Sequence, residues 1–361
     1  MIQASNVPVS LDALLPKNES LFRREIARAL GVKGSALVEV KLLKRSIDAR
    51  KKSNVHGVVT VAVELAEGAD PRPAKGVAVK AYEPAAPLSI PRVEPTGLRP
   101  VVVGAGPAGL FCALYLARAG LQPLVVERGT SVDERVAVVE AFNAGAPLDE
   151  RTNIQFGEGG AGTFSDGKLT TGIKDVRCRK VFLEFVSHGA PQAILYDAKP
   201  HIGTDRLGAV VKSMREEIVS LGGTVLFSSR LLRVIAANGA VHGITYRDAQ
   251  GSEVDFETDA VILAIGHSAR DTVEALYRQG IQMMQKPFSI GARIEHPQEL
   301  IDRAQYGRFA GHPALGAAEH RLDPGDNLLG FKGLDHIIVG TQFQPQHLVK
   351  GLALGSDHDD G

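Results

Sequence analysis

The sequence lacks the features that mark secreted, metal-binding and membrane proteins. It has only two cysteines, Cys112 and Cys178, which form neither a disulfide framework nor a zinc-ligand pattern. Its first residues contain no basic segment followed by an apolar one, so a signal peptide is not expected. No run approaches the ~18 apolar residues that a membrane span needs. A reducing, cytoplasmic setting is therefore the expectation.

The chain also has no excess of positive or negative charge. The chain has 41 Lys and Arg against 41 Asp and Glu, which argues against a dedicated nucleic-acid or membrane-surface protein. One basic run, residues 44–52 (KRSIDARKK), stands out, and no aromatic residue is interleaved with it. Three interpretations of this run stay open: a solvated hairpin loop, a contact with phosphate or nucleic acid, and a docking surface for the domain that follows.

Glycine, by contrast, is abundant: the 39 glycines fall in clusters, which suggests ligand-binding loops built from backbone. Residues 1–83 read as a small α+β domain, with strands expected at 36–43 and 55–65. Its helix is expected between Asn18, as N-cap, and Gly31, as C-terminal stop. Seven prolines between residues 71 and 100 then predict an extended linker.

A dinucleotide-binding pattern begins at Pro100. An apolar strand runs into residues 104–109 (GAGPAG), the G-x-G-x-x-G pattern, which opens an apolar helix. In this pattern the first glycine permits a tight turn and the second lets the backbone approach a pyrophosphate. The third allows close packing of helix on strand, and the helix N-terminus attracts the phosphates. Glu127 ends the next strand, where it can accept hydrogen bonds from ribose hydroxyls.

Three features favour FAD over NAD at this site. Glu127 is followed by Arg128 and Gly129, and the resulting VVERG sequence is similar to that of many flavoproteins. A buried strand at residues 258–266 resembles the second flavoprotein strand motif, although an ordinary core strand is the alternative interpretation. About 130 residues separate the two motifs, which is typical of a two-domain flavoprotein rather than of a simple NAD domain.

The most distinctive segment is residues 153–171. Its five glycines alternate with hydroxyl residues, Asp166 and Lys168. Such a loop exposes backbone N–H groups that can wrap a phosphate or the edge of a flavin. Lys168 is placed to stabilise negative charge on a reduced flavin. A flexible loop with a salt-bridged lysine is the alternative.

These segments resemble a known family. Residues 44–52, 104–109, 156–171 and 307–316 are similar to an uncharacterised bacterial family of FAD-dependent dehydrogenases, a branch of the glutathione-reductase-like Rossmann flavoproteins. The resemblance covers residues 1–318 and implies FAD, oxidoreductase activity and an N-terminal accessory domain, without a known substrate. Family members continue into a glycine-rich loop that closes over the flavin, whereas residues 321–361 do not resemble them. We therefore expect a chain that lacks the usual C-terminal part, with a poorly covered flavin.

The expected fold is α/β. It combines a doubly wound Rossmann-type FAD domain, an inserted and partly β substrate domain, and the preceding small α+β domain. The expected boundaries are residues 1–83 for the small domain, 84–98 for the linker, 99–200 for the FAD-binding βαβ unit and glycine-rich loop, 201–320 for the remaining FAD and substrate segments, and 321–361 for an atypical tail.

The predicted function is FAD-dependent oxidoreduction, in which hydride passes between the flavin and an unknown substrate or NAD(P)H. Two alternatives stay open: an inactive or truncated dinucleotide-binding protein, and an RNA- or protein-docking factor that acts through the basic N-terminal domain. The sequence identifies no catalytic residue, metal site or oligomeric state. The residues expected to bind the cofactor are Gly104, Ala105, Gly106, Pro107, Ala108, Gly109, Glu127, Arg128, Gly159, Gly160, Thr163, Ser165, Asp166, Gly167, Lys168, Ala264 and Gly266.

Overall fold

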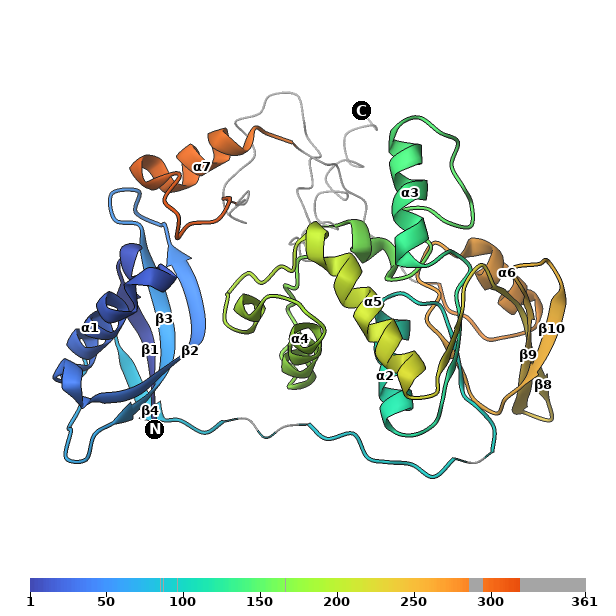
Figure 1. Cartoon of the computed structure of the whole chain (residues 1–361), viewed down its shortest axis with the longest axis horizontal. Helices are drawn as coiled ribbons and strands as arrows, with labels where there is room; N and C mark the ends of the chain where they lie inside the picture. Colours follow the sequence, from blue (N-terminus) through green and yellow to red (C-terminus); the bar gives the residue numbers. More distant parts are fainter. Residues whose placement is uncertain (85, 87, 96, 166, 286–294, 319–361) are drawn as a thin grey trace, which may run out of the picture. The chain divides into compact units, whose positions relative to one another are not determined.

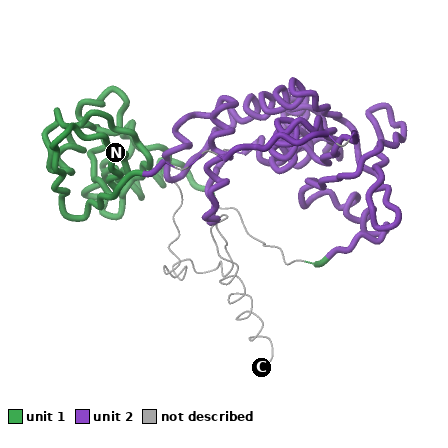
Figure 2. Tube along the Cα trace, turned by 90° about the horizontal axis from the view of Figure 1, so that it is seen from below, with its two compact units in different colours: residues 1–82, 284–361 green, residues 83–283 purple. Residues whose placement is uncertain are grey.

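The computed structural model describes the chain apart from residues 85, 87, 96, 166, 286–294 and 319–361. It divides into two compact units, which Figure 2 colours separately. Unit 1 comprises residues 1–82 and 284–361, and unit 2 comprises residues 83–283. Among the described residues, no helix has both the length and the apolar character needed to cross a membrane.

Unit 1 is built on an antiparallel sheet with the strand order β2-β3-β1-β4 (Figure 1). Alternate β-branched residues of β3, namely Val59, Val61 and Val63, are buried, as the period of two predicts. Helix α1 packs into the same core through Ile26 and Leu30, which are fully buried. The elements are β1 (Ile2–Val9), η1 (Asp12–Leu14), η2 (Pro16–Asn18), α1 (Glu19–Leu30), η3 (Gly34–Ala36), β2 (Leu37–Asp48), β3 (His56–Leu65) and β4 (Ala78–Ala81).

The basic run is partly a strand and not wholly a loop. Strand β2 continues to Asp48, so residues 44–48 pair with β3 and only residues 49–55 form the hairpin connection. Arg50 in this connection pairs with Asp48 at 2.5 Å. The sequence placed the end of this strand at residue 43. Its pairing with β3 continues to Asp48 because the aliphatic residues of β2 and the β-branched residues of β3 favour a strand despite the charged side chains.

A second correction concerns residues 298–318, which the sequence grouped with the FAD and substrate segments. Helix α7 (Gln298–Tyr306) and η6 (Gly307–Phe309) instead belong to unit 1. Tyr306, Leu315 and Ala318 are buried in the core around the N-terminal sheet. Arg308 donates a hydrogen bond to the Ser53 carbonyl in the β2–β3 connection at 3.2 Å. Packing across more than 200 residues of sequence leaves no local signal in the sequence.

Unit 2 contains a parallel sheet with the order β11-β5-β6-β7. Its strands are short, and β5 and β6 are buried throughout, as expected for a sheet covered on both faces. The elements are β5 (Val101–Val103), α2 (Pro107–Arg118), β6 (Leu124–Val126), α3 (Val132–Asn143), η4 (Gly160–Phe164), α4 (Arg177–Ser187), η5 (Gln192–Leu195), α5 (Thr204–Ser220), β7 (Thr224–Leu226), β8 (Arg230–Ala237), β9 (Ala240–Arg247), β10 (Glu253–Glu257), β11 (Val261–Leu263) and α6 (Arg270–Arg278).

The two faces of the parallel sheet carry different layers. Helices α2 and α5 lie side by side on one face (Figure 1), where Leu114 and Ile218 pack against Val102 and Val125. The antiparallel sheet β10-β9-β8 and helix α6 cover the other face. Successive strand residues point to opposite faces, so each strand contributes to both cores. The predicted α/β fold, doubly wound with a partly β insertion, is confirmed.

The strands β8 and β9 form a β-hairpin. They are joined by Asn238 and Gly239, whose φ angles are 53° and 78°. Both values lie in the left-handed region that a two-residue type I′ turn requires. The turn therefore fixes the register of the small sheet locally, before any packing.

Two adjacent residues of α5 test the packing of the helix layer. Ile218 is fully buried and Val219 is 51% exposed. We expect Ile218→Ala to lower the free energy of unfolding by about 2–5 kcal/mol, because it leaves a cavity against the sheet. Val219→Ala is the matched control and should change it by less than about 0.5 kcal/mol. Denaturant unfolding measures both, and equal effects would contradict this packing.

Candidate functional site

The glycines of the first loop have separate structural reasons. Gly104 has a φ of +102°, and a Cβ there would lie 2.4 Å from the Ala264 carbonyl oxygen. A Cβ on Gly109 would lie 1.8 Å from the Gly104 oxygen. Gly106 has an ordinary φ of −70° and is the N-cap of α2. Its nearest neighbour would be the Gly160 Cα at 3.9 Å, so the fold itself leaves room at this position.

The Glu127 carboxylate joins three segments of unit 2. It lies just after β6 and is only 5% exposed. One oxygen accepts the Ala105 N–H at 2.7 Å, and the other accepts the N–H groups of Gly129 and Gly157 at 2.9 and 3.0 Å. A carboxylate offers about four acceptor positions. Three are used by backbone, which leaves about one for an outside hydroxyl.

The second glycine-rich loop lies directly against the first. The Gly159 N–H donates to the Ala105 carbonyl at 2.8 Å. A Cβ on Gly160 would approach the Gly106 Cα to 3.2 Å, and one on Gly129 would approach the Gly157 Cα to 2.6 Å. Backbone meets backbone at these positions, so side chains are excluded. The structure thus brings together two loops that the sequence separates by about fifty residues.

Other predicted residues of this loop have contacts within it. The Thr163 hydroxyl donates to the Glu158 carbonyl at 3.2 Å, and the Ser165 hydroxyl donates to the Gly162 carbonyl at 2.7 Å. The Gly167 N–H donates to the Ser165 hydroxyl at 3.1 Å. Asp166 lies outside the described residues. These hydroxyls therefore shape the loop.

Lys168, Ala264, Gly266 and Ala108 occupy different places. Lys168 is exposed and forms a single antiparallel bridge with His201, outside the parallel sheet. Ala264 follows β11 and donates its N–H to the Val103 carbonyl at 2.8 Å, which brings it next to the first loop. Gly266 has a φ of +69° and is exposed. Ala108, with Pro107, forms the first turn of α2, where N–H groups lack intrahelical partners.

Arg135 organises the second loop, a role that no pattern in the sequence indicated. Its side chain in α3 is fully buried. The guanidinium donates to the carbonyls of Asn153, Ile154, Glu158 and Gly160 at 2.7–2.9 Å. Burial lowers the pKa of Arg135 to about 10, against the opposing effect of nearby carboxylates, so it stays charged at neutral pH. The cation thus holds the carbonyl side of the loop.

Glu158 is the second buried charge that sequence reasoning missed. One carboxylate oxygen accepts the Val132 N–H at the start of α3 at 2.7 Å. The other pairs with Arg215 on α5 at 2.7 Å. Burial raises the pKa of Glu158, and the Val132 hydrogen bond and Arg215 oppose that rise. The glycine-rich loop is therefore anchored to two helices as well as to the first loop.

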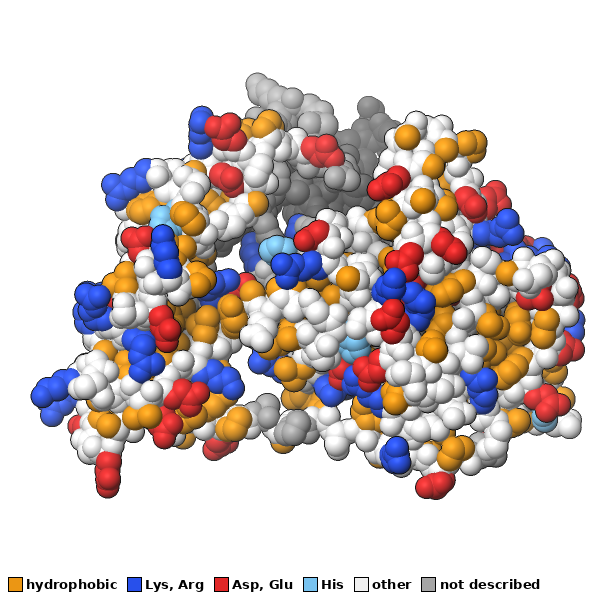
Figure 3. Space-filling model, viewed as in Figure 1, with side chains coloured by type: hydrophobic (Ala, Val, Ile, Leu, Met, Phe, Trp, Pro, Cys, Tyr) orange, Lys and Arg blue, Asp and Glu red, His pale blue; other side chains and the backbone are white. Residues whose placement is uncertain are grey.

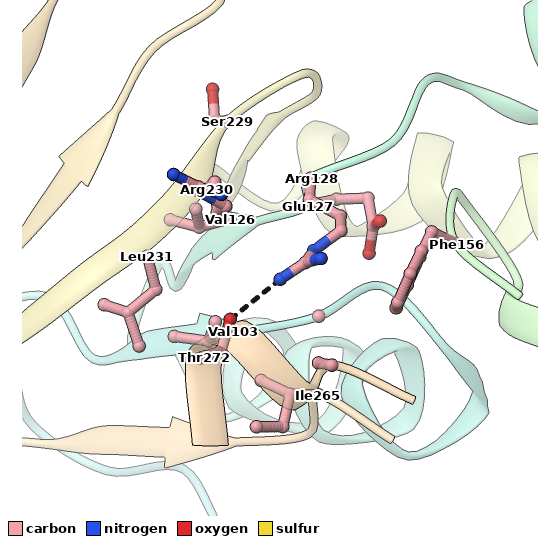
Figure 4. Close-up of a pocket in the computed structure, with 12 residues that line it drawn as sticks. Val103, Val126, Glu127, Arg128, Phe156, Ser229, Arg230, Leu231, Ile265 and Thr272 are labelled. Carbon is pink, nitrogen blue, oxygen red and sulfur yellow. Dashed lines mark hydrogen bonds between the residues drawn. The ribbon is translucent and has the colours of Figure 1, made fainter. Parts of the chain in front are cut away.

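A small cavity of about 40 Å³ opens between the ends of β5, β6 and β8 (Figure 4). Arg128 lies in this region, with its guanidinium 4.5 Å from the centre of the Phe156 ring. It donates to Asp271 at 2.7 Å and to the Thr272 hydroxyl at 2.8 Å, the bond drawn in Figure 4. Arg230 also pairs with Asp271, at 3.1 Å. Of these residues, only Arg128 was predicted from the sequence to bind the cofactor.

Asp271, which pairs with both Arg128 and Arg230, is held in its charged form. Burial acts to raise the pKa of Asp271, but hydrogen bonds and charge from Arg128, and charge from Arg230, outweigh it and the pKa is lowered. The pairing thus persists at neutral pH. Over the described part of the chain, no cluster of three His, Cys, Asp or Glu side chains is arranged to hold a metal ion.

Family comparisons agree with this architecture. The model described as pyridine nucleotide-disulphide oxidoreductase matches residues 98–286, more than half of the chain. Residues 1–64 match a "Domain of unknown function (DUF8436)", and residues 287–327 match "FAD-dependent protein, C-terminal domain-like". Taken together, the matches support an FAD-dependent oxidoreductase in general and leave its substrate open.

A protein of Clostridium beijerinckii described as uncharacterized is 44% identical over 328 residues. The match covers 89% of this chain but only 59% of that relative. Among solved structures, THI4 of Thermovibrio ammonificans is 18% identical, with a TM-score of 0.34 over 51% of this chain and 64% of that one. The FAD complex of Bacillus halodurans glycerol-3-phosphate dehydrogenase is 15% identical, with a TM-score of 0.33 over 50% and 36%.

Replacing Arg135 tests its hold on the loop. Arg135→Met removes the donors of four carbonyls, and we expect the free energy of unfolding to fall by roughly 3–5 kcal/mol. Arg135→Lys keeps the charge but not the fork of donors, so its loss should be intermediate. Arg151→Met, at an exposed site in the same region, should change stability by less than about 0.5 kcal/mol. Thermal unfolding with limited proteolysis of residues 150–165 measures these effects. An Arg135→Met protein with native stability would refute the role.

Proposed function

Because the chain belongs to the pyridine nucleotide-disulphide oxidoreductase family, we propose that it binds FAD and transfers hydride between the flavin and either NAD(P)H or a substrate not yet identified. The observation that carries the proposal is the buried Glu127 carboxylate, which fixes two glycine-rich loops beside the N-terminus of α2. The chain spans 59% of the length of its Clostridium relative, so activity and substrate of the whole protein stay within this proposal.

The residues present fit the ADP half of such a cofactor. The remaining acceptor position of Glu127 suits a ribose hydroxyl, and its charge disfavours a 2′-phosphate. The open side of Gly106 lets a pyrophosphate approach the backbone, and the first turn of α2 offers N–H groups and a partial positive charge. Gly159 and Gly160 would border the same phosphates, because they lie against Ala105 and Gly106.

Arg128 and Phe156 would bound the adenosine end. Their stacking, fixed by Asp271, provides a flat and partly apolar wall beside the end of β6. When bound, FAD would supply the hydride-accepting chemistry, while protein groups orient it and exclude water. Lys168, which the sequence placed near the reduced flavin, stays a candidate for stabilising negative charge.

An absorbance spectrum of the purified chain is the direct test. We expect flavin absorption bands, and denaturation should release FAD at close to one equivalent per chain. Anaerobic addition of NADH or NADPH should then bleach the bands if a nicotinamide is the electron donor. A chain that acquires no flavin after incubation with excess FAD would refute the proposal. Retained ADP-ribose binding in that case would leave a dinucleotide-binding protein without flavin chemistry.

Two glycine substitutions separate binding from folding. Gly106→Ala meets only ordinary contact distances, so it should cost less than about 1 kcal/mol of stability, mainly from the poorer N-cap. Its methyl group should still block the pyrophosphate and weaken FAD binding at least tenfold. Gly109→Ala should destabilise unit 2 strongly, because its Cβ would overlap the Gly104 oxygen. Unfolding and FAD titration measure both, and unchanged FAD affinity in Gly106→Ala would argue against this cradle.

A further inference from the structure

Unit 1 carries a basic groove that the proposed flavin chemistry does not use. It is an open depression of about 480 Å³ on the surface of α1. Three arginines of α1, Arg23, Arg24 and Arg28, line it, and Ala27 and Val32 contribute apolar surface. No acidic residue is among those that line it. Figure 3 shows Lys and Arg side chains over α1, with acidic side chains beside them.

The helix presents these charges on one face. Ser20, Arg24 and Arg28 follow one another at intervals of four residues, which places them in line along the helix. Arg24 and Arg28 are exposed, and like charges at this spacing repel each other. Glu25, an acid on the same helix, is engaged elsewhere: it accepts hydrogen bonds from the Ser10 N–H and hydroxyl at 2.7 and 2.8 Å.

Arg23 is fixed by backbone rather than by an acid. Its guanidinium donates to the carbonyls of Leu37 and Val38, at 2.5 and 3.3 Å. These carbonyls orient the side chain without neutralising it. Residues 17–33 carry five Lys and Arg against two Glu, although the chain as a whole is neutral. The local field at the groove is therefore positive and suits an anion.

We propose that this groove binds a phosphorylated small molecule of nucleotide size. Arginine forks bind phosphate oxygens in pairs, the Ser20 hydroxyl can donate to one more, and the apolar floor at Ala27 suits a planar body. The residues that line the groove include no aromatic side chain on which bases could stack, which favours a small ligand over a nucleic-acid strand.

Calorimetric titration of ADP into the FAD-saturated full chain tests this site. We expect saturable binding to wild type and at least tenfold weaker binding to the double variant Arg24→Gln with Arg28→Gln. The matched double variant Lys41→Gln with Lys51→Gln removes the same charge from exposed positions outside the groove and should stay within twofold of wild type. Adenosine, which lacks phosphate, should not bind measurably.

Each other outcome overturns the proposal. Absence of saturable ADP binding to wild type, or unchanged binding in the arginine variant, means that the groove is not the site. Equal losses in both double variants mean general electrostatic attraction only. Circular dichroism and thermal unfolding confirm that the arginine variant is folded. Saturation with FAD occupies the dinucleotide site of unit 2, so the comparison between the two double variants then reports on ADP binding in unit 1 alone.

Discussion

The candidate site depends on one buried anion, Glu127, and one buried cation, Arg135. Both form hydrogen bonds with the backbone of the second glycine-rich loop, from opposite sides. Glu127 accepts the Gly157 N–H at the edge of the parallel sheet, while Arg135 donates to the carbonyls on either side of it. Buried charges are costly unless hydrogen bonds replace the lost water. Backbone dipoles satisfy both charges here, so the loop and the charges stabilise each other. Glycine at position 157 follows from this, because a Cβ there would lie 2.5 Å from the Arg135 side chain.

Secondary-structure elements hold both loops. The first loop is fixed by β5 and α2, and the second is fixed by α3 and α5 through Glu158, Val132 and Arg215. Hydrogen bonds within the chain define the course of both loops, which would hold the site in place for the proposed dinucleotide. Preorganisation of this kind reduces the entropy lost on binding. The Arg128–Asp271–Arg230 cluster extends the same frame beyond the end of β6.

Unit 1 shows a different use of charge. The sequence left three interpretations of its basic run open: a solvated loop, a contact with phosphate or nucleic acid, and a docking surface. In the structure, Arg50 of this run pairs with Asp48, and Ser53 in the same connection accepts a hydrogen bond from Arg308. The cations that face a groove are instead on α1. The antiparallel sheet also receives α7, and with it the residues that follow the dinucleotide-binding unit in sequence. Unit 1 is therefore discontinuous, and its core requires both ends of the described chain.

The sequence alone determined the local parts of this protein. The strand leading to Gly104, the acid at Glu127 and the hairpin at Asn238 were all predictable, because backbone geometry and short-range spacing dictate them. Only the tertiary structure revealed that Arg135 holds the second loop, and that residues 298–318 pack on the N-terminal sheet. These features join residues distant in sequence, where a buried arginine is indistinguishable from a surface one. Partners that are chosen by packing leave no periodic pattern, and the three-dimensional fold alone decides them.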